Sequence, residues 1–265
     1  SFDLDDQLDH IDGSGDAGFQ LKISPNDAIG ISSIDFSSLI VATDADGDSA
    51  TAAIGGFTIA VENDTPKGAG TLQTQTVFED GLSGQSTGIG GGSTAAVFTA
   101  AQLATLVNAG ADEPVTVKLA DATQLSGDTG LDSKGFQVNW QVVDATHING
   151  VATADGNRVV FTLVESPAGT FTFTLQDQVD HLSGLGDNDA SATLDLAKAF
   201  VATDYDGDSV QLDSGAVVAI NNDVPENNAT TLQTQTVFED GLTGQSTGIG
   251  GGSTAAVFTA AQLAT

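Results

Sequence analysis

Residues 169–176 read Gly-Thr-Phe-Thr-Phe-Thr-Leu-Gln, so apolar and polar side chains alternate along the stretch. A period of two places Phe171, Phe173 and Leu175 on one face of a β-strand and the threonines on the other face. The same alternation recurs at 57–61 and at 136–140. Strands of this kind are half-buried and typical of antiparallel sheets. The sequence therefore predicts an all-β fold.

Working outward from this stretch, turn-forming residues divide the chain into short strands. The predicted turns include Asn149-Gly150, Asp155-Gly156, Pro167-Ala168-Gly169 and Asp206-Gly207. Short strands at regular spacing favour an immunoglobulin- or cadherin-like antiparallel β-sandwich, with a parallel solenoid as the alternative. Seven strands are predicted, at 71–78, 115–119, 137–143, 158–164, 169–176, 194–203 and 216–221.

One segment departs from the alternating pattern and predicts a short helix at about 100–108. Thr99 and Gln102 have the spacing of a capping box, in which each side chain bonds the backbone N–H of the other residue. Leu103, Leu106 and Val107 share one helical face, and Gly110 is suited to end the helix. We expect this helix to be an addition to the β-sandwich.

The chain contains a near-verbatim internal repeat. Residues 71–105 return at 231–265 with only Ser83 replaced, by Thr243, and the first ten residues resemble those around 173–181. Two matching segments, Asn63-Asp64-Thr65-Pro66 and Asn222-Asp223-Val224-Pro225, are called exits, because each follows the predicted last strand of a repeat. The proline of each exit ends the hydrogen bonding of that strand. We expect repeats in tandem: the C-terminal part of one repeat, a complete repeat, and the N-terminal part of the next, at 1–67, 68–226 and 227–265.

The composition points to cations as partners. The chain has 36 acidic and six basic residues, a formal net charge of −30, and no cysteine. Such a charge excludes nucleic acid and anionic membranes as partners, and the absence of thiols excludes disulfides and thiolate metal sites. No uninterrupted 18-residue apolar stretch predicts membrane insertion. Self-repulsion on this scale favours a fold that binds or is screened by cations.

The best candidate for chemistry is an acidic loop that occurs twice. Three aspartates alternate around a glycine turn at Asp44, Asp46 and Asp48, and again at Asp204, Asp206 and Asp208. Calcium prefers six to eight oxygen ligands, of which such a loop can supply several. The loop is not an EF-hand, because no glutamate stands at the twelfth position. The plain alternative is a solvated Asp-Gly turn without an ion.

In a sandwich, the turn before the last strand lies at the same pole as the preceding linker. We therefore expect the second acidic loop to face Asn63 and Asp64 and to clamp a Ca²⁺ ion between two repeats. Other recurring acidic or amide residues extend the predicted ligand set: Glu79, Asp80, Asn222, Asp223, Glu239 and Asp240.

Enzyme motifs are weak in this sequence. Gly84-Gln85-Ser86-Thr87-Gly88 and its copy around Ser246 match the spacing of a nucleophile elbow, but a glycine-rich run comes next where a helix is required. His10, His147 and His181 have no second histidine at metal-binding spacing, and Asp-His steps are common in turns and caps. Trp140 belongs to an alternating strand, which indicates a core position rather than carbohydrate stacking. We expect no catalytic site.

Several ordered motifs resemble the tandem extender repeats of giant type I-secreted bacterial adhesins of the RTX class, which are similar to VCBS and cadherin-like repeats. The motifs are the strand at 169–175, the step Gln178-Val179-Asp180-His181, the stretch 201–209 around the second acidic loop, and both Asn-Asp-x-Pro exits. The glycine-rich nonapeptide calcium repeats of that class are absent from this chain. The resemblance implies an extracellular, calcium-dependent repeat at a bacterial cell surface.

The sequence thus predicts a structural repeat that projects an adhesive domain for attachment and biofilm formation. Its expected partners are calcium ions, neighbouring repeats of the same chain and other copies of itself. The alternatives are a self-assembling filament, sheath or surface-layer protein, a glycan-binding repeat and, least favoured, an enzyme.

Overall fold

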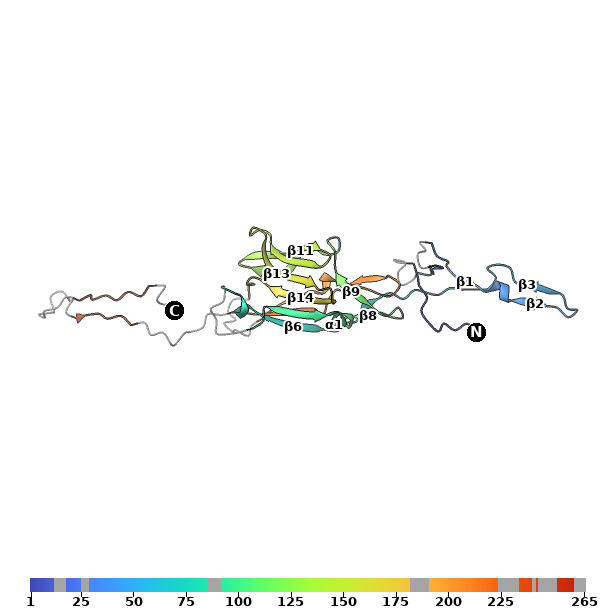
Figure 1. The fold of residues 1–265 in the computed structure, drawn as a ribbon, viewed down its shortest axis with the longest axis horizontal. Coiled ribbons are helices and arrows are strands. Elements are labelled where there is room, and N and C mark those ends of the chain that lie inside the picture. Colours follow the sequence, from blue (N-terminus) through green and yellow to red (C-terminus); the bar gives the residue numbers. More distant parts are fainter. Residues whose placement is uncertain are drawn as a thin grey trace. The chain divides into compact units, whose positions relative to one another are not determined.

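The computed structural model describes residues 1–11, 18–24, 29–84, 92–181, 191–223, 234–239, 242 and 252–259 (Figure 1). The chain divides into two compact units, Ser1–Val224 and Pro225–Thr265. Strands make up nearly all of the regular structure, so the fold is all-β, as predicted. Residues 1–67 are called the N-terminal segment, 68–223 the central segment and 231–265 the C-terminal segment.

The largest sheet has six antiparallel strands in the spatial order β10-β11-β12-β13-β14-β7 (Figure 1). Along β14, Phe171, Phe173 and Leu175 are buried and the threonines between them are half-buried, which confirms the period of two. Phe171 pairs with Phe98 across the β14–β7 ladder. The strands are β7 (Ala95–Thr99), β10 (Asp128–Ser133), β11 (Phe136–Asp144), β12 (His147–Ala152), β13 (Arg158–Glu165) and β14 (Thr170–Leu175).

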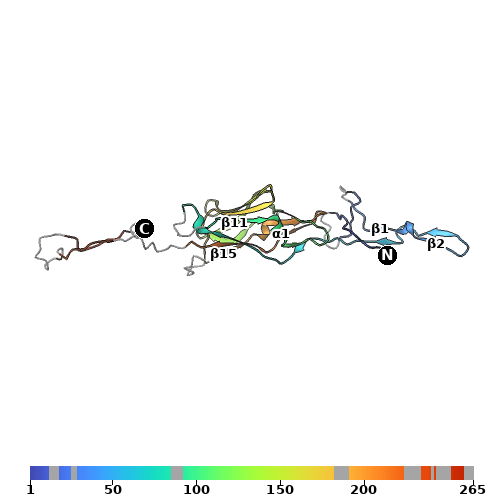
Figure 2. The ribbon, with the colours of Figure 1, turned by 60° about the horizontal axis from the view of Figure 1, so that its bottom comes forward.

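Two three-stranded sheets complete the central segment. One has the order β15-β18-β6, in which β18 and β6 are parallel, and the other has the order β17-β16-β9. Figure 2 labels β15 of the first of these sheets and β11 of the six-stranded sheet. Their strands are β6 (Gln73–Phe78), β9 (Thr116–Leu119), β15 (Ser191–Asp195), β16 (Phe200–Thr203), β17 (Ser209–Gln211) and β18 (Ala216–Asn221). A short pair, β5 (Lys67–Gly68) with β8 (Val107–Asn108), lies where the N-terminal and central segments meet.

The predicted single strand at 194–203 is wrong. The 3₁₀ turn η3 (Ala197–Ala199) interrupts it and sends β15 and β16 into different sheets. The cause is the Asp195 carboxylate, which accepts backbone N–H bonds from Ala197 at 2.9 Å and from Ala216 at 3.2 Å. A short acidic side chain that bonds nearby backbone groups competes with the ladder and turns the chain.

Other strands were not predicted from the pattern. The segments 95–99, 128–133 and 209–211 form β7, β10 and β17. The predicted turn at Asn149-Gly150 is also wrong, because both residues pair within β12. A Cβ on Gly150 would lie 2.1 Å from the Phe161 ring, so this glycine serves packing rather than turning.

The predicted helix exists but is shorter than expected. In α1 (Ala100–Ala104), Thr99 N–H donates to Gln102 Oε1 at 2.9 Å and Gln102 N–H donates to Thr99 Oγ1 at 3.2 Å, which confirms the capping box. The helix ends at Ala104 rather than near 108, because Val107 and Asn108 pair with β5 instead.

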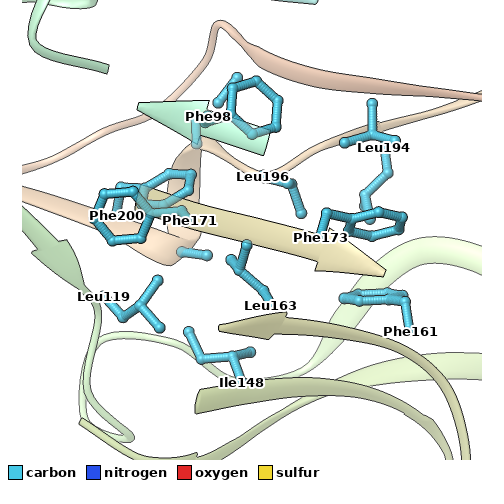
Figure 3. Packing of buried hydrophobic residues seen from close by; sticks show 14 of the residues in the cluster. Phe98, Leu119, Ile148, Phe161, Leu163, Phe171, Phe173, Leu194, Leu196 and Phe200 are labelled. Carbon is cyan, nitrogen blue, oxygen red and sulfur yellow. The ribbon is translucent and has the colours of Figure 1, made fainter. Parts of the chain in front are cut away.

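The strands of the central segment enclose one hydrophobic cluster. Phe161, Phe171, Phe173 and Phe200 are fully buried, and ring centroids lie 5.1 Å apart both between Phe161 and Phe173 and between Phe171 and Phe200. Figure 3 shows labelled side chains from the six-stranded sheet and from the 194–200 segment pointing into the same interior. Trp140 belongs to this cluster, as predicted.

The N-terminal segment repeats part of this arrangement. The pair β1 (Ile34–Asp35) with β4 (Thr58–Ile59) corresponds to β15 with β18, and β2 (Val41–Thr43) with β3 (Ser49–Thr51) corresponds to β16 with β17. The 3₁₀ turns η1 (Ser37–Leu39) and η3 also match, while η2 (Glu79–Gly81) comes after β6. The same sequence order thus produces the same local elements twice.

Candidate metal centre

The second acidic loop connects β16 to β17 and is built by local hydrogen bonds. Asp204 Oδ1 accepts the N–H groups of Gly207 at 3.1 Å and Asp208 at 2.8 Å, and Asp204 N–H donates to the Asp208 carbonyl at 3.0 Å. Gly207 has a φ of 111°, a left-handed conformation that favours glycine. The loop shape therefore derives from the Asp-x-Asp-Gly-Asp sequence itself.

The first acidic loop, between β2 and β3, has the same shape. Asp44 Oδ1 accepts the N–H groups of Gly47 at 3.1 Å and Asp48 at 2.9 Å, and the φ of Gly47 is 103°. The three carboxylates of this loop, those of Asp44, Asp46 and Asp48, can bring one oxygen each within 4.8 Å of one another. All three are exposed to solvent.

At the second loop, buried carboxylates converge from two parts of the chain. Asp112, Asp204 and Asp206 each place an oxygen within 4.8 Å of the others, and these residues are only 3 to 7 % exposed. Asp112 is anchored by its carbonyl, which accepts the Tyr205 N–H at 3.0 Å. Asp112 was not predicted as a ligand. Asp112 precedes β9 in the sequence. Because β9 pairs with β16, Asp112 lies next to the acidic loop that follows β16.

Residues of the N-terminal segment close over this cluster. His10 N–H donates to Asp206 Oδ2 at 2.9 Å, and Lys22 Nζ donates to the Asp206 carbonyl at 2.9 Å. The Asn63 side-chain amide donates to the Asp208 carboxylate. The structure therefore brings the second acidic loop and the Asn63 exit together, as predicted from the sequence.

Asp64 fastens the exit to the segment that carries Asp112. Asp64 Oδ2 accepts the N–H of Ala111 at 2.9 Å. Gly110 has a φ of 69°, and a Cβ there would lie 1.9 Å from Asp64 Oδ2. Glycine at 110 thus permits the contact, a role different from the helix-ending one predicted for it.

Burial places an electrostatic cost on the cluster. Desolvation raises the pKa of the Asp204 carboxyl to about 7, and the hydrogen bond and the charge of Asp206 act in the same direction. Desolvation also raises the pKa of Asp112, with repulsion from Asp206 as the second cause. By contrast, hydrogen bonding by the Asp46 side chain lowers the pKa of the exposed Asp44. The same loop sequence therefore has opposite shifts in two environments.

When both carboxylates are ionised, two buried oxygens of the cluster have no hydrogen-bond donor among the residues that the structure describes: Asp204 Oδ2 and Asp206 Oδ1. Buried carboxylate oxygens without partners are costly, and a bound cation is a common way to satisfy them. The donor set consists of carboxylate oxygens, the ligand type of hard cations. The donor set is therefore of a type that a hard divalent cation would accept.

The remaining predicted ligands lie elsewhere. Glu79 is buried, with Oε1 accepting the Val179 N–H at 2.6 Å and Oε2 accepting the Asp223 N–H at 3.3 Å. Desolvation raises the pKa of Glu79 to about 7. Glu79, Asp80, Asn222 and Asp223 form no third close carboxylate cluster within the described part of the chain.

Some of the residues predicted from motifs lie outside the part of the chain that the structure describes. Glu239 is described, but Asp240 lies outside the described residues, as do Ser86 and Ser246 of the two Gly-x-Ser-x-Gly matches.

His181 Nε2 lies 3.3 Å from Glu79 Oε2, and desolvation lowers the pKa of His181. His10 takes part in the acidic cluster through its backbone, with Nδ1 3.9 Å from Asp206 Oδ2.

Comparisons with known proteins do not place the chain in a family. No family model, no curated protein and no solved structure matches it. Within the described residues, the helices are too short or too polar to cross a membrane.

Proposed function

We propose that this chain is a set of extender repeats from a calcium-stabilised bacterial surface adhesin, with no catalytic activity. One observation carries the proposal: Asp112, Asp204 and Asp206 converge in a buried cluster that residues of the N-terminal segment close. A cation held there would link the residues before the exit Asn63-Asp64-Thr65-Pro66 to the central segment after it. The proposed repeats are 1–67, 68–226 and 227–265.

Charge favours a divalent ion at this position. Asp112, Asp204, Asp206 and Asp208 are all buried, and like charges at such separations repel strongly where water is excluded. A Ca²⁺ ion would offset this repulsion and take up the unpartnered oxygens of Asp204 and Asp206. At ten times the dissociation constant, bound calcium would add about 1.4 kcal/mol of stability per site.

A linker stiffened by a bound ion suits a protein whose proposed role is to span a distance. Without the ion, the linker would bend more freely at the exit, since inter-domain contacts of modest area allow motion. With it, consecutive repeats would form a stiffer rod. An extracellular location would supply calcium in the range of roughly 0.1 to 1 mM, in which modules of this kind typically bind.

The proposed fold type is an immunoglobulin- or cadherin-like sandwich. Support comes from the hydrophobic cluster, which combines Phe171 and Phe173 of the six-stranded sheet with Leu194, Val218 and Ile220 of the sheet β15-β18-β6. Two sheets that share one core are the defining arrangement of a sandwich. The resemblance to RTX-class adhesin repeats supports the extracellular location and the role in attachment.

Thermal unfolding of the 265-residue chain in CaCl₂ and in EDTA tests this function. We expect a higher melting temperature in calcium, and we expect Asp206→Asn to remove most of the difference. Asp46→Asn is the matched control, because it makes the same change at the same position of the exposed loop. The proposal fails if EDTA leaves the melting temperature unchanged, or if the two variants lose the calcium effect equally.

A further inference from the structure

The central segment has a pocket at the base of the β16–β17 hairpin, at the end away from the second acidic loop. Its volume is about 350 Å³, within the usual range of small-molecule pockets. Buried apolar side chains form the floor: Leu125, Trp140 and Leu212. Polar residues surround it, among them Gln124, Asp128, Lys198, Gln211 and Asp213. An apolar floor with a polar rim is the usual composition of a small-molecule site.

Hydrogen bonds hold the walls of this pocket in place. Asp121 Oδ1 accepts the N–H groups of Thr123 at 2.7 Å and Gln124 at 3.2 Å, which fixes the turn that enters the wall. Gln211 Nε2 donates to the Gln124 carbonyl at 3.1 Å and to the Lys198 carbonyl at 2.6 Å. The Gln211 side chain therefore ties this turn to both strands of the hairpin. A pocket fixed in this way loses little freedom when a ligand binds.

Two polar groups of the pocket residues remain available to a ligand. Because the Gln211 amide donates to two backbone carbonyls, its Oε1 is left as an acceptor. The indole N–H of Trp140 has no acceptor among the residues that the structure describes, and it is not sealed from solvent. Phe161 holds the Trp140 ring, with ring centroids 5.5 Å apart and the planes at 79°. The pocket thus has one fixed acceptor and one fixed donor.

The polar rim is not needed to form the hairpin. The N-terminal segment contains the same hairpin in β2 and β3, where Val41 pairs with Thr51 as Val201 pairs with Gln211. The acidic loop is the same in both hairpins, but the rim is not: Lys198, Gln211 and Asp213 correspond to Ser38, Thr51 and Ala53. The fold therefore does not account for the rim residues, and a ligand would.

Charge and shape restrict the class of ligand. The rim has two carboxylates, those of Asp128 and Asp213, and one ammonium group, that of Lys198. Together with the net charge of −30, this disfavours anions. Trp140 is only 9 % exposed, so it offers no open ring face to a cation. An uncharged ligand with several hydroxyl groups fits best, because each hydroxyl can both donate and accept.

We propose that this pocket binds an uncharged saccharide, as a single sugar ring that is either free or at the end of a glycan. Asp128, Asp213 and Gln211 Oε1 accept hydrogen bonds from its hydroxyls, and Lys198 and Trp140 Nε1 donate to its oxygens. The volume holds on the order of ten water molecules, which suits one ring rather than an extended chain of sugars.

Sugar binding goes beyond the extender role and is independent of the acidic cluster. The second acidic loop joins the far ends of β16 and β17, whereas Lys198 and Gln211 lie at their near ends. Calcium binding and sugar binding can therefore succeed or fail separately.

Titration of the 265-residue chain, followed by Trp140 fluorescence, tests the proposal, because the chain contains a single tryptophan. The probes are glucose, galactose, mannose and N-acetylglucosamine, each also as its methyl glycoside, which represents the end of a glycan. We expect at least one probe to give a saturable change, with a dissociation constant on the order of 1 mM. Binding of the methyl glycoside identifies a glycan end, and binding of the free sugar alone identifies a free saccharide.

Two further probes separate the proposal from its rivals. Glucuronate carries a negative charge, and choline carries a positive one, so both should bind more weakly than the best neutral sugar. No saturable change with any neutral probe at roughly ten times the expected dissociation constant would overturn the proposal. Tighter binding of choline or of glucuronate would overturn it as well.

Matched variants test the residues. Asp128 and Asp144 are both exposed, and each accepts the N–H of the residue two positions later at 2.8 Å, but only Asp128 lines the pocket. Asp128→Ala should weaken sugar binding about tenfold or more, and Asp144→Ala should leave it unchanged. Asp213→Ala should also weaken binding about tenfold. It introduces the residue that the first hairpin has at Ala53, so it keeps the test valid if Asp128→Ala fails to fold. Equal binding by all three variants would contradict the assignment.

Discussion

At the scale of single residues, a glycine determines whether the exit can reach the acidic cluster. Gly110 adopts a left-handed φ of 69° and leaves room for the Asp64 carboxylate, which bonds the Ala111 N–H at 2.9 Å. A side chain at 110 would meet two costs, one from backbone strain and one from the clash with Asp64. The sequence predicts a turn at Gly110, but it does not show that the Asp64 carboxylate lies next to this glycine.

We predict that Gly110→Ala lowers the free energy of unfolding by about 1 to 3 kcal/mol. Urea unfolding followed by Trp140 fluorescence measures this. Gly70→Ala is the control, because Gly70 has a φ of 68° with no atom near its Cβ position, so it carries the strain without the clash. In an Asp64→Ala background the two glycine variants should cost the same, and a persistent difference would show that the clash lies elsewhere.

At the scale of elements, an aspartate controls how one strand becomes two. Asp195 accepts the N–H groups of Ala197, Gly215 and Ala216, and so divides β15 from β16. Asp35 does the same for Ser37 and Gly55 in the N-terminal segment. The stretch 194–203 is mostly apolar, with Asp195, Lys198 and Thr203 as its polar residues, so a periodicity argument predicts one strand. The interruption comes from hydrogen bonds to Ala197, two positions away, and to Gly215 and Ala216, 20 and 21 positions away.

We predict that Asp195→Ala destabilises the central segment by on the order of 3 kcal/mol, because three buried backbone N–H groups lose their acceptor. Asp35→Ala should change the same transition by less than about 1 kcal/mol, since its partners lie outside the main core. Trp140 fluorescence reports the transition in both variants. Equal effects would mean that the two segments unfold as one cooperative body.

At the scale of the whole molecule, charge links stability to pH. Desolvation raises the pKa values of Glu79 and Asp204 to about 7, from ordinary values of 4.5 and 3.8. A raised carboxyl pKa means that the folded chain binds more protons than the unfolded chain between the two values. In the absence of metal, the contribution of these two carboxyl groups to the free energy of unfolding is complete below their ordinary pKa values and is lost as pH rises through about 7.

We predict that in EDTA the free energy of unfolding falls between about pH 5 and about pH 8, by on the order of 3 kcal/mol at most for Glu79. Glu79→Gln, which resembles the protonated acid, should flatten this fall, whereas exposed Glu62→Gln should leave it unchanged. Calcium should stabilise more at higher pH, because protons compete for the aspartates. A melting temperature in EDTA that rises over this range would contradict the assignment.

The sequence by itself determined the all-β class, the capping box of α1, the two acidic loops and the repeat. These features rest on contacts within a few residues, such as those of Asp204 with Gly207 and Asp208, so the pattern is enough to read them. The tertiary structure alone decided the addition of Asp112, the splitting of 194–203 and the burial of one loop. Residues 44–48 and 204–208 fold alike, yet only the second has the N-terminal segment packed against it. The desolvation of the second loop depends on residues that are distant in the sequence but packed against it. A local sequence pattern does not specify those residues.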